Sequence, residues 1–122
     1  MMAQNRPPGW PQEVQPPGSE GWEATAVAWL LDLMPEYRQY DTVRRHPVIL
    51  AFMARHLVHG SVEGAREAYR TARTELTEHA PPHAVDAALK AYRDEGRRLA
   101  AAERAAELVE RALRGGPYTR TW

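Results

Sequence analysis

The chain has 122 residues, room for one domain with a single core, and its 16 basic residues balance 16 acidic ones. This balance excludes a net field that would draw the whole molecule to nucleic acid or to an anionic membrane, so any charge-driven binding depends on local segregation. Cysteine is absent, which excludes disulfide frameworks, thiolate catalysis and cysteine-ligated zinc, and it favours a cytoplasmic location.

The N-terminal residues 1–18 are rich in proline, which fixes φ and removes backbone hydrogen-bond donors. We predict an extended or disordered tail here, followed by a single helical domain over 19–114. Trp10 and Val14 are the two possible anchors of this tail. They allow two interpretations, a tail that docks partly on its own domain or a recognition peptide for a partner. The tail has no apolar segment of the kind that directs secretion, and the longest apolar run, 47–54, is too short to span a bilayer. We therefore expect no membrane partner.

The first helix is predicted over 20–34, where apolar residues recur at helical spacing and form one face. Ser19 is expected to cap its N-terminus and Pro35 to end it. Residues 35–40 predict a short second helix or a turn, and 41–46 a connector to Pro47 at the first position of the next helix. The predicted core face of the first helix comprises Trp22, Ala26, Trp29, Leu30 and Leu33.

Two long helices are predicted over 47–79 and 82–114, because the only breakers lie at Ala80, Pro81 and Pro82 between them and at 115–117 after them. Each helix would be about 50 Å long at 1.5 Å per residue. Their equal lengths and the tight proline turn predict an antiparallel hairpin. The fold class is therefore all-α, with the shorter helices packed at the open end of the hairpin in a three- or four-helix base. Residues from about 66 to 95 project as a two-helix arm, and residues 115–122 should fray.

The two long helices share a heptad pattern that is typical of a coiled-coil seam. Gly60 and Gly64 lie outside this seam, and each interior glycine costs about 1 kcal/mol relative to alanine. A close approach by the first helix, or by a second copy of the chain, would explain them, and we favour packing within the chain. The constant register of the seam pairs Leu76 with Val85, Ala72 with Leu89, Tyr69 with Tyr92, Ala65 with Gly96, and Val62 with Leu99.

The candidate metal site is formed by His56, His59 and Glu63, which stand at i, i+3 and i+7 on one stripe of a helix. The hairpin register places Arg97 near Glu63 and sets alanines opposite His59. A guanidinium competes for the carboxylate and repels a cation. We therefore expect neither a metal nor another cofactor, and an ion-paired surface instead.

The possible anion site is Arg44, Arg45 and His46, at the start of a long helix, where a phosphate is often held. The alternative is that these residues pair with Asp41 or Glu36. The sequence contains neither a nucleophile elbow nor a glycine-rich phosphate loop. We therefore name no catalytic residues and do not expect an enzyme.

One side of the arm gathers basic residues at e and b heptad positions, relieved by Glu63 and Asp86. The opposite side carries glutamates among alanines. Arg66 stands opposite Arg93, a like-charge pair that stability alone does not select. The alternative is a merely solvated face on which Arg73 pairs with Asp86. The six residues are Arg66, Arg70, Arg73, Lys90, Arg93 and Arg97.

These patterns favour a non-catalytic helical adaptor that contacts an acidic macromolecular partner, with a protein favoured over nucleic acid. A nucleic-acid-associated accessory protein is the first alternative, and it predicts an affinity that falls steeply with salt. A metal-dependent enzyme is the last alternative. A homodimer is also compatible with the sequence.

Overall fold

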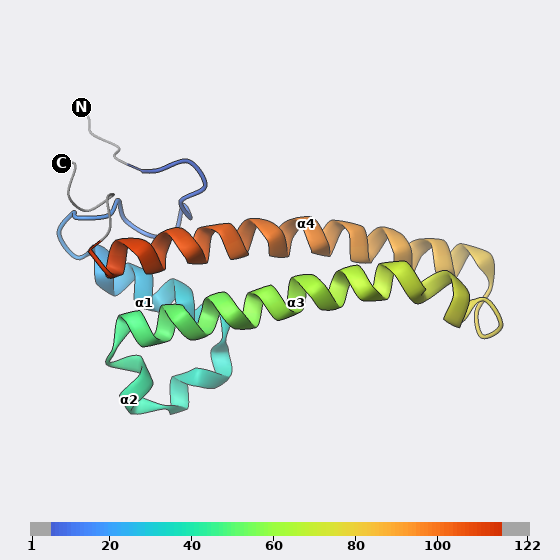
Figure 1. The fold of residues 1–122 in the computed structure, drawn as a ribbon, viewed down its shortest axis with the longest axis horizontal. Helices are drawn as coiled ribbons and strands as arrows, with labels where there is room; N and C mark the ends of the chain where they lie inside the picture. The colour runs from blue at the N-terminus through green and yellow to red at the C-terminus, as the bar shows by residue number, and fades with distance from the viewer. Residues whose placement is uncertain (1–5, 116–122) are drawn as a thin grey trace.

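The computed structural model describes residues 6–115, and all regular secondary structure in this part of the chain is helical. The helices α3 (Pro47–Leu76) and α4 (Pro82–Leu113) form an antiparallel hairpin along the whole molecule (Figure 1). At its open end lie α1 (Trp22–Leu33), the 3-10 helix η1 (Pro35–Gln39) and α2 (Asp41–Arg44). The predicted all-α hairpin with a broad base and a projecting arm is confirmed. No helix within 6–115 is both long and apolar enough to cross a membrane.

The start of α1 differs from the prediction. The hydroxyl of Ser19 donates to the carbonyl oxygen of Pro16 at 2.5 Å, so it caps a proline turn and not the helix. Gly21 occupies the N-cap position with a φ of 76°, a left-handed conformation that glycine adopts without steric cost. The helix therefore begins at Trp22 and not at Glu20.

Prolines set the starts of both long helices, as predicted: Pro47 and Pro82 occupy their first turns. α3 ends three residues earlier than predicted, at Leu76. Its carbonyl oxygen accepts the backbone N–H groups of His79 and Ala80 at 2.9 and 3.1 Å in a turn. Because Ala80 precedes a proline, it is disfavoured in the helical region, and the chain unwinds before it.

The segment from Arg6 to Gly21 forms turns that dock on its own domain, which is one of the two interpretations of the tail. Trp10, 7% exposed, and Val14, fully buried, belong to the hydrophobic core. The ring of Trp10 lies 5.9 Å from that of Trp22, and its Nε1 donates to the carbonyl oxygen of Val14 at 3.1 Å. The prolines hold turns that place these side chains on the base. Residues 1–5 and most of the predicted C-terminal tail lie outside the described residues.

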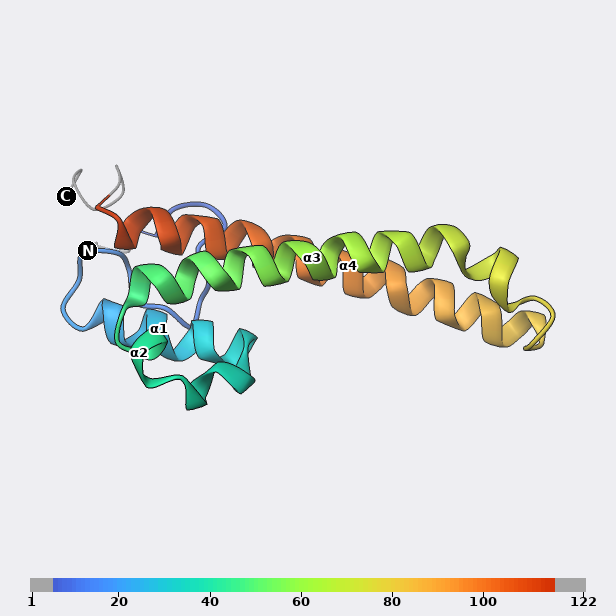
Figure 2. The same ribbon diagram turned by 60° about the horizontal axis from the view of Figure 1, so that its bottom comes forward.

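The core lies in the base. The largest fully buried side chains include Val14, Leu30, Leu50 and Val109, from the N-terminal segment, α1, α3 and α4. The arm extends beyond all the other elements in both ribbon views (Figure 2). The cross-hairpin ion pair between Arg73 and Asp86, at 3.2 Å, lies within one helical turn of the predicted register.

The interior glycines of α3 do not serve a close approach by α1. A Cβ built at Gly60 or at Gly64 meets nothing within 4 Å. The prediction of tight packing against the first helix at these two glycines is therefore wrong. Both glycines are exposed.

Candidate functional site

A groove of about 440 Å³ lies between the two helices of the arm. Tyr69 of α3 and Tyr92 of α4 line it, and they are 42% and 40% exposed although both occupy heptad seam positions. The small residues Ala65 and Gly96 line the same groove. Because these two residues carry little or no side chain, they leave open space between the helices, and the tyrosine rings beside them stay half-exposed.

Three predicted basic residues also line this groove: Arg66 and Arg70 from α3 and Arg93 from α4. The hairpin brings them together from positions that are far apart in the sequence. The groove therefore combines aromatic rings with guanidinium groups from both helices. Sequence reasoning placed the tyrosines in the seam and missed the groove, for which the pairing of Ala65 with Gly96 was the available signal.

The other predicted basic residues of the arm lie outside this groove and are exposed. Most of the basic side is ion-paired, and the pair of Arg73 with Asp86 is the one that the alternative interpretation names. Glu67 and Asp94 act as partners in addition to Glu63 and Asp86, because residues three or four apart on one helix are neighbours. The side chains of all four pairs are more than half exposed, where an ion pair contributes about 0 to 1 kcal/mol. The pairs are Arg66 with Glu63 at 2.9 Å, Arg70 with Glu67, Arg73 with Asp86 at 3.2 Å, and Lys90 with Asp94 at 2.8 Å.

Arg93 and Arg97 have no ion-pair partner within 4 Å among residues 6–115. Their positive charges nonetheless affect the pKa of Asp94. The hydrogen bond and the charge of Lys90 lower the pKa of this carboxyl below its ordinary value, and the two arginines lower it further. Arg93 is thus an uncommitted guanidinium at the edge of the groove.

The candidate metal ligands do not converge. His59 Nδ1 lies 2.7 Å from a carboxylate oxygen of Glu103. The ring of His56 packs against that of Phe52, with 4.6 Å between the ring centroids. Glu63 accepts from Arg66 on its own helix and not from the predicted Arg97. The prediction of only alanines opposite His59 is wrong, because the longer Glu103 side chain reaches it from the next position of α4. Nowhere in the described chain do three histidine or acidic side chains gather as a metal site.

The candidate anion site is occupied by an acidic side chain. Arg44 donates to Asp41 at 2.5 Å, and Arg45 approaches the other oxygen of the same carboxylate at 3.4 Å. His46 Nδ1 lies 2.8 Å from the carbonyl oxygen of Thr42. The alternative stated from the sequence, pairing with Asp41, is the arrangement in the structure.

The sequence did not single out a buried ionic cluster in the base. The side chain of Glu110 is 7% exposed, and it accepts from Arg55 Nε at 2.5 Å and from Arg114 at 2.9 and 3.0 Å. Burial raises the pKa of this carboxyl, but the hydrogen bonds from the two arginines outweigh it, and the pKa lies below its ordinary value. The cluster joins the start of α3 to the end of α4, so its role is structural.

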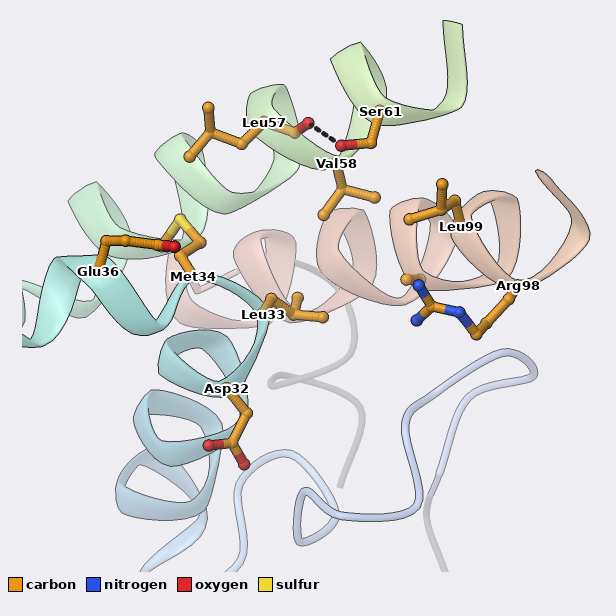
Figure 3. Close-up of a pocket in the computed structure, with 10 residues that line it drawn as sticks. Asp32, Leu33, Met34, Glu36, Leu57, Val58, Ser61, Arg98 and Leu99 are labelled. Carbon is orange, nitrogen blue, oxygen red and sulfur yellow. Dashed lines mark hydrogen bonds between the residues drawn. The ribbon is translucent and has the colours of Figure 1, made fainter. Parts of the chain in front are cut away.

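A second cavity of about 390 Å³ lies where the end of α1 meets the hairpin. Figure 3 shows that Leu33, Leu57 and Leu99 approach it from three helices. Two of its charged side chains are already engaged, Asp32 by Arg38 at 2.6 Å and Arg98 by Glu95. It therefore offers less for recognition than the groove of the arm.

Comparison with family models, with curated proteins and with solved structures found no match. The arm groove offers two chemical capacities in one place. Half-exposed tyrosines such as Tyr69 can cover apolar or planar groups, and arginines such as Arg93 can bind carboxylates or phosphates through two hydrogen bonds.

Proposed function

We propose that the protein is a non-catalytic helical adaptor that binds an acidic macromolecular partner through the basic side of its arm. The observation that supports this most directly is the groove, where Tyr69 and Tyr92 stay half-exposed among arginines of both helices. Aromatic residues and arginine are the side chains most enriched at the energetic centres of protein interfaces. An exposed aromatic pair on an otherwise polar arm contributes little to the stability of the free chain.

A protein partner is favoured over nucleic acid because of the acidic residues on the same side of the arm. Six basic residues share this side with Glu63, Glu67, Asp86 and Asp94. Affinity for nucleic acid grows with the number of phosphates that Lys and Arg side chains neutralise. The carboxylates on this side of the arm compete with phosphates for the same basic side chains. The carboxylates of a protein partner need only a few well-placed arginines.

Single-stranded nucleic acid is the second candidate, and the tyrosines beside the uncommitted Arg93 support it. Nucleic-acid bases stack on exposed aromatic rings, and an adjacent arginine holds the backbone. Binding of a labelled single-stranded oligonucleotide that falls steeply with salt would favour this candidate. A partner held by apolar contacts as well as by charge responds less to salt.

The test of the proposed function is the charge reversal of Arg70 and Arg93 to Glu. Capture of partners from a native extract should collapse, while the melting temperature stays nearly unchanged because exposed charges contribute about 0 to 1 kcal/mol. The matched control reverses Arg38 and Arg104, which are also exposed, and changes the net charge by the same amount. Retention of every partner by the arm variant at wild-type yield would contradict the proposal.

A further inference from the structure

We propose that the groove of the arm receives one amphipathic helix of the partner, with a stripe of apolar and small side chains between two acidic flanks. The arm would then become a local three-helix bundle. This inference rests on the proposed function and specifies the chemistry of the partner. Three features of the arm support it: its missing cover, the open space above Gly96 and its charge.

The missing cover is visible when the arm is compared with the base. In the base, α1 and the N-terminal segment pack on the hairpin and complete a core. In the arm, the seam residues Tyr69, Leu76 and Tyr92 are among the exposed large hydrophobic side chains. A coiled-coil seam of two helices that leaves its large residues half-exposed is completed by a third helix along the same groove.

The floor of the groove leaves room for a side chain of an incoming helix. A Cβ built at Gly96 meets nothing within 4 Å, so the space above this glycine is open. An interior glycine costs about 1 kcal/mol relative to alanine, and contact with a partner side chain at this position would offset that cost. Ala65 lines the same space from the other helix. An apolar side chain of the incoming helix therefore fits between the two tyrosines.

The charges specify acidic flanks. Arg66 and Arg70 stand on the α3 wall of the groove and Arg93 on the α4 wall. A helix in the groove presents one flank to each wall, as e and g positions do in coiled coils. Glutamates on both flanks would pair with Arg93, and they would compete for Arg66 and Arg70, whose present ion pairs are exposed and weak. A second copy of the chain docked by the same face would bring like charges together, which disfavours a symmetric dimer here.

The probe is a synthetic peptide of three heptads with Leu at a, Ala at d and Glu at e and g, and its matched control carries Lys at e and g. Binding to the full chain is measured by fluorescence anisotropy. The blocking variant is Gly96→Leu, which fills the groove. Its control is Gly64→Leu, on the outward face of α3, where a Cβ also meets nothing within 4 Å. Both substitutions raise helix propensity, so neither should unfold the chain.

The Glu peptide should bind, and the Lys peptide should bind at least about tenfold more weakly. Gly96→Leu should lower the affinity for the Glu peptide by about tenfold or more, because a central contact is lost. Gly64→Leu should leave this affinity unchanged. Equal binding of the two peptides, or wild-type binding by Gly96→Leu, would overturn the inference. Self-association in sedimentation that Gly96→Leu abolishes would also overturn it, because a second copy would then fill the groove. If charge reversal abolishes capture of natural partners and Gly96→Leu does not, the inference fails while the proposed function stands.

Discussion

At the scale of single residues, Glu110 is the buried charge of the described chain. Its carboxylate is held by Arg55 and Arg114, and the arginine side chains themselves reach solvent. A carboxyl with a pKa lowered in the folded state stabilises the fold above its unfolded pKa, here near the ordinary value of 4.5. This contribution disappears as the pH falls through the lower pKa of the folded state.

We therefore expect Glu110→Gln to lower the free energy of unfolding by about 1 to 3 kcal/mol at neutral pH, because a hydrogen-bonded charge is lost from a buried site. The variant should also lose less stability than wild type as the pH falls from neutral to below the ordinary carboxyl pKa of 4.5. Urea unfolding at several pH values measures both effects. Asp94 and Glu95 also have lowered pKa values, so the pH dependence of the variant should flatten only in part. Identical pH dependence in the two proteins would contradict the role assigned to Glu110.

At the scale of elements, substitution of Gly60 and Gly64 tests whether another helix or chain packs on this face of α3. Because a Cβ at Gly60 or Gly64 meets nothing within 4 Å, the double substitution to Ala should raise the free energy of unfolding by up to about 2 kcal/mol, about 1 for each glycine. Chemical denaturation of the variant measures the gain. A loss of stability that grows with protein concentration would instead indicate a second copy packed on this face.

The long helices followed from the sequence because their signals are local. Pro47 and Pro82 are compatible only with a first turn, and heptad spacing selects the seam. The hydrogen bond of Ser19 could not be predicted from the sequence. Its hydroxyl can bond either to the N-terminus of the helix or to the preceding turn, and the path of the prolines places the carbonyl oxygen of Pro16 within reach. The burial of Trp10 was open for a related reason, since proline content describes the backbone and says little about where a nearby large side chain docks.

The candidate site was predicted only in part, because it depends on distances between elements. The heptad pattern correctly put Arg66, Arg70 and Arg93 on one side of the arm. It overestimated their free charge, since Glu67 reaches Arg70 along the same helix. The groove lies beside Ala65 and Gly96. Its volume depends on the distance between the two helices, which the heptad pattern of one helix does not determine.

At the scale of the whole molecule, stability should be distributed unevenly between base and arm. The core cluster joins the N-terminal segment, α1 and the base halves of α3 and α4. The buried seam residues of the arm are small, such as Ala65, Ala72 and Val85, and they bury little apolar area. Regions with few buried apolar contacts open locally at a lower free-energy cost than the core.

Amide hydrogen exchange read by mass spectrometry should therefore show faster exchange in residues 66–95 than in the base halves of the same two helices. The physical reason is that opening the arm exposes little apolar surface, whereas opening the base disrupts the packing around Leu50 and Val109. Addition of the acidic three-heptad peptide should slow exchange in the arm alone, because a third helix buries the rings of Tyr69 and Tyr92. Gly64→Leu should show the same protection and Gly96→Leu should not. Uniform exchange along both long helices of the free chain would show that the arm is as stable as the base and would contradict this division.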